Sequence, residues 1–315
     1  MKIGWGLEEK EFEKWENIIT IGSFDGIHRG HSIILKNLLK LATKYGGKSI
    51  VITFDPLPKE FLKKNNFQVI TTLEEKLKIL QENGIDGVCI IPFTEDFSKI
   101  EPYNFLKKIW KHFRPYAISV GYTHHFGKDG SGGVSLLEEF SKEKGIDLLE
   151  VEDVKVDDMT VSSSRIRDFI SQGEITKAND MLGREFFFSA TVNRGQGIGK
   201  TLSYPTANLK INSLKKILPK QGVYAAKVFL NSRNFGAMLY LGKRPTFYED
   251  SRSTCEVYIM GFKGNLYDKQ LFVKVVDRIR EERKFRSAQN LRSQIMNDEE
   301  TARKIINSLV SKQGG

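Results

Sequence analysis

The sequence predicts an α/β protein of two domains: an N-terminal doubly wound parallel sheet, followed by a small antiparallel β-barrel with a terminal helix. Three observations support this prediction. The length of 315 residues suits about two domains. The first half alternates continuous apolar runs with amphipathic segments. After about residue 183, short alternating runs separated by turn residues replace that pattern.

The first half contains five apolar runs that have the length of buried strands. They are residues 17–22, 48–54, 87–93, 116–121 and 146–151. Helical periodicity lies between them, at 32–45, 73–82 and 104–113, and Thr72 with Glu75 forms a capping box before the second helix. Strands without alternation, joined by helices, indicate a parallel sheet covered on both faces. Ligands bind such sheets at the carboxyl ends of the strands.

The second half begins after two short predicted helices, Ser164–Gln172 and Glu174–Leu182. We therefore place the domain boundary between residues 1–182 and 183–315. Predicted strands follow at 186–195, 222–231, 234–242, 253–262 and 270–279. Alternating apolar and polar residues in these runs are typical of a small barrel. A terminal helix is expected from about Ser287.

The net charge is +10 and the isoelectric point about 9.3. Because basic and acidic residues are mixed along the chain, we expect a solvated basic surface, with neither nucleic acid nor membrane as a partner. Cys89 and Cys255 have neither metal-type spacing nor a disulfide framework. With no signal peptide and no span of about 18 apolar residues, the sequence predicts a cytoplasmic protein. It leaves the oligomeric state open.

The motif GSFDGIHRGH follows the first long apolar run and leads into a helix. Its glycines permit tight turning, and His28 and His31 share one face of the helix start, where free N–H groups favour phosphate. On its own, a pair of histidines is more often structural, and a zinc site would need a third ligand. Asp25 has an equally plain alternative as a turn aspartate that only caps.

This motif resembles the nucleotidyltransferase signature of the bacterial bifunctional riboflavin kinase/FMN adenylyltransferase family, also called FAD synthetase. The segments VITFDPLPKEFL, VGYTHHFGKDGSGG and VSSSRIRDFISQGEITKANDMLGR resemble further parts of the same family. In the last segment, serines and arginines at a helix start could meet a phosphate, although an ordinary capped helix would look the same.

A second motif, GQGIGKTLSYPTANL, begins at Gly195. The glycines alone would suggest only a flexible hairpin loop. The following P-T-A-N resembles the riboflavin kinase signature, in which threonine and asparagine hold Mg²⁺ and phosphates. The family's general base maps onto Glu256, although the sequence alone would favour a strand glutamate that faces solvent.

The resemblance implies ATP-dependent phosphorylation of riboflavin to FMN, then adenylyl transfer from ATP to FMN. It implies Mg²⁺ as cofactor, ATP as co-substrate, and riboflavin and FMN as the other small-molecule partners. The implied catalytic residues are Glu256, His28 and His31. The implied ATP-binding residues are Gly22, Phe24, Asp25, Gly30, Ser163, Ser164, Arg165, Gly195, Gly197, Gly199, Lys200, Thr206 and Asn208. The implied flavin-binding residues are Thr123, Phe126, Arg280 and Phe285, and the implied metal ligands are Thr206 and Asn208.

One departure from the family pattern leaves an alternative open. Thr123 stands where the family usually has Asp or Asn, so the first domain could be weak and the protein chiefly a kinase. A second alternative is another nucleotidyltransferase or a synthetase-like tRNA enzyme. A third is a basic nucleic-acid-binding protein, which would bind with a steep salt dependence. The chain carries no RNA-binding signature that favours it.

Overall fold

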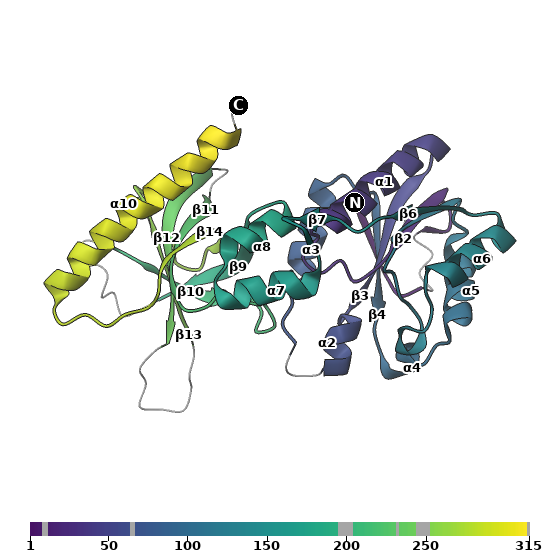
Figure 1. Ribbon diagram of the computed structural model, residues 1–315, viewed down its shortest axis with the longest axis horizontal. Helices are drawn as coiled ribbons and strands as arrows, with labels where there is room; N and C mark the ends of the chain where they lie inside the picture. Colours follow the sequence, from purple (N-terminus) through teal and green to yellow (C-terminus); the bar gives the residue numbers. More distant parts are fainter. Residues whose placement is uncertain (8–11, 64–66, 195–203, 231–232, 244–252, 314–315) are drawn as a thin grey trace. The chain divides into compact units, whose positions relative to one another are not determined.

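The computed structural model describes residues 1–7, 12–63, 67–194, 204–230, 233–243 and 253–313. The chain divides into two compact units, Met1–Ser163 and Ser164–Gly315 (Figure 1). Residues 164–182, which the sequence assigns to the end of the first domain, fall in the second of these units. Which activity they serve stays a prediction.

A parallel sheet forms the centre of the first unit. Its strands lie in the order β1-β4-β3-β2-β5-β6. Their bounds are β1 Lys2–Trp5, β2 Asn17–Ile21, β3 Lys48–Asp55, β4 Gly87–Pro92, β5 Ala117–Gly121 and β6 Asp147–Val151. The five predicted strands are confirmed. The sequence missed β1, a short edge strand whose side chains Ile3 and Trp5 are largely exposed, because it has no continuous apolar run.

Helices cover both faces of this sheet, as the doubly wound prediction requires. The bounds are α1 Arg29–Tyr45, α2 Pro58–Lys63, α3 Leu73–Glu82, α4 Glu95–Ser98, α5 Pro102–Phe113, η3 Lys128–Gly130 and α6 Val134–Lys144. One face packs Ile19, Ile50 and Ile118 against α5 and α6. The other face meets α1, where Ser119 Oγ lies 3.4 Å from the Ile34 carbonyl oxygen. The capping box of Thr72 and Glu75 is confirmed.

The strand order creates a switch point beside β2. From β2 the chain builds β3 and β4 on one side of the sheet, then crosses over to build β5 and β6 on the other. Loops leaving the carboxyl ends of β2 and β5 therefore diverge, and a ligand can reach the backbone between them. The motif that begins at Gly22 and the loop that begins at Tyr122 occupy these two positions.

A closed antiparallel barrel forms the second unit, in the order β10-β13-β12-β11-β14-β9, with β9 pairing back onto β10. The bounds are β9 Phe186–Asn193, β10 Ala207–Ile211, β11 Gly222–Leu230, β12 Arg233–Lys243, β13 Ser253–Ile259 and β14 Gln270–Arg280. The predicted barrel is confirmed. The sequence missed β10, a five-residue strand that directly follows Pro205 and Thr206, because these residues suggest a turn.

Helices also lie on the outside of the barrel: α7 Ser163–Gln172, α8 Ile175–Leu182 and α10 Ala288–Gln313 (Figure 1). Asn179 ties α8 to the barrel, because its Nδ2 donates to the carbonyl of Val275 at 3.0 Å. The terminal helix α10 buries Ala302 against Met238 and Val276. A short hairpin, β7 Lys155–Val156 and β8 Met159–Thr160, precedes α7.

Candidate active sites

The loop after β2 holds an unusual backbone. Phe24 and Ile27 have φ of 47° and 40°, a left-handed region that non-glycine residues rarely occupy, and Gly26 has φ of 87°. Such conformations cost about 1–3 kcal/mol each and persist where surrounding contacts impose them. Glycine at position 30 also avoids a tight contact, since a Cβ there would lie 3.3 Å from Nδ1 of His28.

His28 and His31 lie together at the start of α1. Their rings stack with centroids 3.7 Å apart and an interplanar angle of 15°. His28 is the N-cap residue, and its Nδ1 accepts the backbone N–H of His31 at 3.4 Å. The Phe24 ring lies against the His31 ring, with the two centroids 5.0 Å apart. The predicted juxtaposition of the two imidazoles at a helix N-terminus is therefore present.

The His31 imidazole is neutral near pH 7. Burial, then the nearby His28 and Lys76, hold the pKa of His31 well below its usual value. Nδ1 of His31 is buried and has no hydrogen-bond partner among the described residues. A neutral ring with an unprotonated Nδ1 carries its proton on Nε2, from which it could donate to a phosphate oxygen.

Asp25 faces the protein interior. It is 2% exposed, and its Oδ1 accepts the backbone N–H groups of Ile70 at 2.9 Å and Thr71 at 3.0 Å. Thr71 in turn accepts the N–H of Gly26 through Oγ1 at 3.0 Å. These contacts fix the loop to the segment before α3, so the capping alternative for Asp25 has direct geometric support. Its assignment to ATP stays a prediction.

Sequence reasoning missed Lys76, which is 2% exposed beneath the same loop. Its Nζ donates to the carbonyl oxygen of Ser23 at 2.8 Å and to Oγ1 of Thr53 at 3.1 Å. Burial lowers its pKa to about 8, against the opposing effects of nearby carboxylates. A signal existed in the sequence: Lys76 precedes the buried Ile79 and Leu80 by three and four residues, on the core-facing stripe of α3.

The other predicted residues of the first site are placed as follows. Ser163 begins α7, and its Oγ donates to the carbonyl of Asp25 at 2.8 Å. Ser164 and Arg165 continue the first turn of α7, in the second compact unit. Thr123 is exposed in the loop after β5, and Phe126 is buried with its ring centroid 5.5 Å from that of His124.

The barrel carries the second candidate site. Oγ1 of Thr206 donates to Oε2 of Glu256 at 2.9 Å. Asn208 lies directly opposite Glu256 in the β10–β13 register, and Tyr240 lies opposite it on β12. The structure therefore brings together the predicted base and both predicted metal ligands. The Tyr240 hydroxyl donates to the Glu282 carboxylate, and burial raises its pKa, so it stays protonated.

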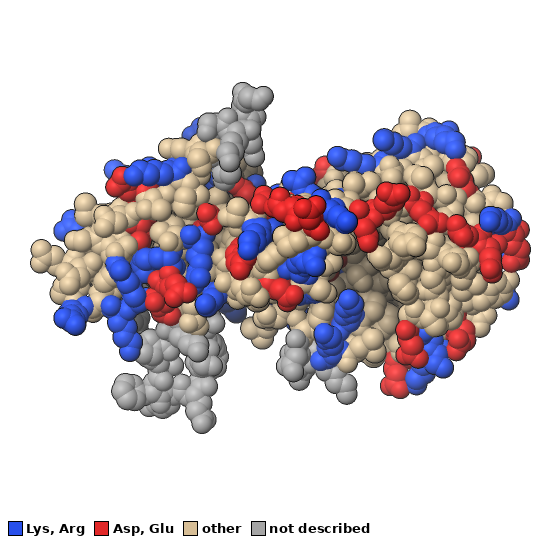
Figure 2. Space-filling model, in the orientation of Figure 1, with Lys and Arg blue, Asp and Glu red and all other residues tan. Residues whose placement is uncertain are grey.

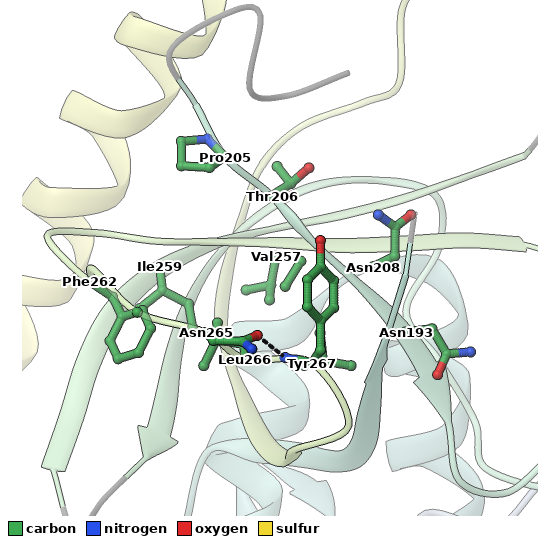
Figure 3. Close-up of a pocket in the computed structure, with 13 residues that line it drawn as sticks. Asn193, Pro205, Thr206, Asn208, Val257, Ile259, Phe262, Asn265, Leu266 and Tyr267 are labelled. Carbon is green, nitrogen blue, oxygen red and sulfur yellow. Dashed lines mark hydrogen bonds between the residues drawn. The ribbon is translucent and has the colours of Figure 1, made fainter. Parts of the chain in front are cut away.

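A cavity of about 340 Å³ is lined by Thr206 and Asn208, whereas Glu256 is not part of its lining (Figure 3). Thr206 and Asn208 line one wall, while the segment between β13 and β14 forms another. Figure 3 shows the Tyr267 ring rising from that segment towards Asn208, and Asn265 Oδ1 accepts the backbone N–H of Tyr267 at 2.9 Å. Sequence reasoning missed Asn265 and Tyr267, because one Asn and one Tyr in a turn carry no chemical signature.

Arg280 holds the terminal helix. Its Nε lies 2.9 and 3.0 Å from the two carboxylate oxygens of Asp298 on α10, and its guanidinium lies 5.5 Å from the Phe285 ring centroid. The Asp298 side chain is 3% exposed, so this ion pair is almost fully buried on the acidic side. The predicted flavin residues Arg280 and Phe285 are thus neighbours, and their role towards flavin stays a prediction.

Four predicted ATP-binding residues lie outside the described residues: Gly195, Gly197, Gly199 and Lys200. In the part of the chain that the structure describes, no group of three or more His, Cys, Asp or Glu could hold a metal ion. Cys89 and Cys255 are buried thiols that form no disulfide within the described residues. No helix within the described ranges has the length and apolarity to cross a membrane. Figure 2 shows Lys and Arg interleaved with Asp and Glu on the visible face.

Comparisons with known proteins match both halves of the chain. The family model for FAD synthetase matches residues 10–165, and that for riboflavin kinase matches residues 182–306. A bifunctional riboflavin kinase/FMN adenylyltransferase of Buchnera aphidicola is 33% identical over 98% of this chain and 99% of its own. One of Listeria monocytogenes is 30% identical over 92% of this chain and 94% of its own.

Among solved structures, one titled a macrolide-efflux protein from Streptococcus pneumoniae is similar, with a TM-score of 0.86 and 28% identity. The match covers 96% of this chain and 99% of that one. This solved structure therefore shares its fold with nearly the whole chain, and the sequence matches cover both halves of the chain. The chain belongs to the family of bifunctional riboflavin kinases/FMN adenylyltransferases.

Proposed function

We propose that this protein makes flavin cofactors in two steps: the barrel phosphorylates riboflavin to FMN, and the N-terminal unit transfers AMP from ATP to FMN, giving FAD and pyrophosphate. Membership of the family supports both activities. The observation that carries the proposal is the hydrogen bond between Thr206 and Glu256 in the barrel, because it joins a phosphate-side hydroxyl to a proton acceptor. We assign the activities to residues 1–182 and 183–315, in a cytoplasmic enzyme.

At the barrel site, Glu256 accepts the proton of the ribityl 5′-hydroxyl while that oxygen attacks the γ-phosphorus of ATP. Phosphoryl transfer needs positioning, charge neutralisation and a proton acceptor, and little covalent work from the protein. Asn208 and Thr206 line the cavity and are themselves neighbours of Glu256, so we place the phosphates on the side of these two residues. The Tyr267 ring offers a flat apolar face for a purine base.

Mg²⁺ is the metal that these residues suit. It takes oxygen ligands, keeps several waters and binds through substrate phosphates, so few protein ligands are needed. Thr206 donates its hydroxyl proton to Glu256, which leaves oxygen lone pairs for a cation. The amide oxygen of Asn208 supplies a second neutral ligand. When bound, Mg²⁺ would neutralise charge on the phosphates. We also assign ATP binding to Gly195, Gly197, Gly199 and Lys200, which lie outside the described residues.

At the N-terminal site, an FMN phosphate oxygen attacks the α-phosphorus of ATP, and pyrophosphate leaves. His28 and His31 donate hydrogen bonds to the charge that develops. Ser163, Ser164 and Arg165 contribute hydroxyl and guanidinium groups at the start of α7, and Gly22, Phe24 and Gly30 shape the loop around the nucleotide. Thr123 and Phe126 are assigned to the flavin side. The reaction requires no covalent enzyme intermediate.

The test is a time course with purified protein, riboflavin and Mg-ATP, in which flavins are separated by chromatography. FMN followed by FAD is the expected result. FMN that accumulates without FAD would leave a kinase alone and point to Thr123 as the impairing change. Riboflavin and supplied FMN that both stay unconverted would refute the proposal. A matched reaction with EDTA tests the Mg²⁺ requirement, since FMN should then not form.

A further inference from the structure

Residues 70–76, which the family motif does not include, contact the strained loop before His28 at two places, beside further contacts from Thr53 and Ser163. Asp25 accepts two backbone N–H groups from this segment, at Ile70 and Thr71. At the other end of this segment, Nζ of Lys76 donates to the Ser23 carbonyl at 2.8 Å. Phe24 and Ile27, whose φ angles are positive, thus follow the Ser23 carbonyl, which the buried ammonium group of Lys76 fixes.

A buried ammonium group is costly to place in this position. Methionine or leucine would fill the same space without a desolvation penalty, and Lys is rarely buried unless it is paired. Lys76 makes no ion pair in the described residues within 4 Å, since both of its hydrogen bonds go to neutral oxygens. The carboxylates of Asp25, Asp55 and Glu60 act on it only through space. Two hydrogen bonds and three nearby carboxylates thus hold a charged group directly beneath the loop, where an apolar side chain could not fix the Ser23 carbonyl.

The charge of Lys76 acts on His31. After burial and His28, Lys76 is the third cause that holds the pKa of His31 below its usual value. The same histidine has a buried Nδ1 without a partner among the described residues. A positive charge beneath the loop disfavours a second proton on this ring, so the imidazole stays neutral, and its tautomer with the proton on Nε2 can donate to a phosphate.

We propose that Lys76 is a positioning residue of adenylyl transfer, which fixes the Ser23 carbonyl and thereby the loop that presents His28 and His31. This inference rests on the proposed role of His31. Lys76 does not touch the reacting atoms. It acts through the loop geometry and through the charge that His31 experiences.

The test compares two variants. K76M removes the charge and nearly keeps the length of the side chain, and K76R keeps the charge. K78M is the matched control, because Lys78 lies on the same helix with its side chain 46% exposed. Each variant is assayed for FAD formation from supplied FMN between pH 5 and 9, and for riboflavin phosphorylation in the barrel. A thermal melt of each variant reports on folding.

In K76M we expect FAD formation to fall at least about tenfold, because small displacements of a positioned group cost about that much or more. The acid limb of its pH profile should move to higher pH, because loss of the positive charge at position 76 raises the pKa of His31. K76R should keep the limb in place, and K78M and all kinase rates should match the wild type. A K76M profile that keeps its acid limb, with or without a uniform loss of rate, would overturn the proposal.

A measurement on the unaltered protein covers the case in which K76M does not fold. The His31 imidazole is titrated by NMR, with H31Q used to assign its signal. A His31 pKa at or above the ordinary value of 6.5 would overturn the proposal without any Lys76 variant. If H28A/H31A retains FAD formation, the assigned role of the histidines is wrong. A different His31 pKa in K76M would then still show that the Lys76 charge acts on His31.

Discussion

Oγ1 of Thr206 lies 2.9 Å from Oε2 of Glu256, and the hydroxyl donates its proton to the carboxylate. The contact joins the segment that leads into β10 to strand β13, residues fifty positions apart in the chain. One hydrogen bond thereby orients the proposed proton acceptor and one proposed Mg²⁺ ligand together. Loss of either side chain should therefore disturb the kinase site and leave the other site intact.

E256A should abolish FMN formation and spare FAD formation from supplied FMN. General base catalysis contributes about 10² to 10⁴ in rate, so a loss of that size is expected in the first activity only. Both activities are measured by chromatography of flavins with the same protein sample. Equal loss of both would contradict separate sites.

T206V should impair the kinase more than T206S. Valine keeps the shape of threonine but removes the hydroxyl that meets Glu256, whereas serine restores it. We expect T206V to need a higher Mg²⁺ concentration for half-maximal FMN formation, and T206S to remain close to the wild type. An unchanged Mg²⁺ dependence in T206V would remove Thr206 from the proposed ligands.

H28A/H31A should have the reverse selectivity of E256A. Removal of a hydrogen-bond donor to developing charge costs about 10² to 10³ in rate, and here both stacked rings are removed. FAD formation from FMN should fall by at least that factor while riboflavin phosphorylation continues. Retained adenylylation would disprove the role assigned to the histidine pair.

The N-terminal unit should lose stability as the pH falls from 6.5 towards 4. Burial lowers the pKa of His124 from 6.5 to about 4, and that of His31 also lies below its usual value. Below pH 6.5 the unfolded chain takes up protons that the folded chain does not, so the free energy of unfolding decreases. His124 contributes at most about 3 kcal/mol. In urea melts, H124F should flatten this dependence, and an identical slope would contradict the assignment.

D298N should destabilise the barrel by about 3 kcal/mol, because it leaves the Arg280 charge partly buried without its partner. The double variant R280M/D298L should lose less than D298N, since apolar side chains of similar volume can replace a buried ion pair. The melting temperatures of the wild type, D298N and R280M/D298L measure these losses of stability. A D298N melting temperature equal to the wild type would show that the pair does not hold α10. The KM for riboflavin in R280M separately tests the predicted flavin contact.

Much of the fold followed from local patterns. The apolar runs of β2 to β6 lie between sheet faces that are both covered by helices, so each run is continuous and easily recognised. The predicted helix at 73–82 has the observed bounds, because Thr72 and Glu75 cap it locally. Strands β1 and β10 escaped prediction because one is an exposed edge and the other begins at a turn-like segment.

The sequence by itself determined the order of the elements, the two motifs and the family they resemble, because hydrophobic period, turn chemistry and residue spacing are local properties. Only the tertiary structure decided that Asp25 faces inward, that Lys76 lies beneath the loop before His28, and that Glu256 meets Thr206. These contacts join residues 46, 53 and 50 positions apart. Burial and through-space charge depend on which segments the fold brings together, and no local pattern contains that information.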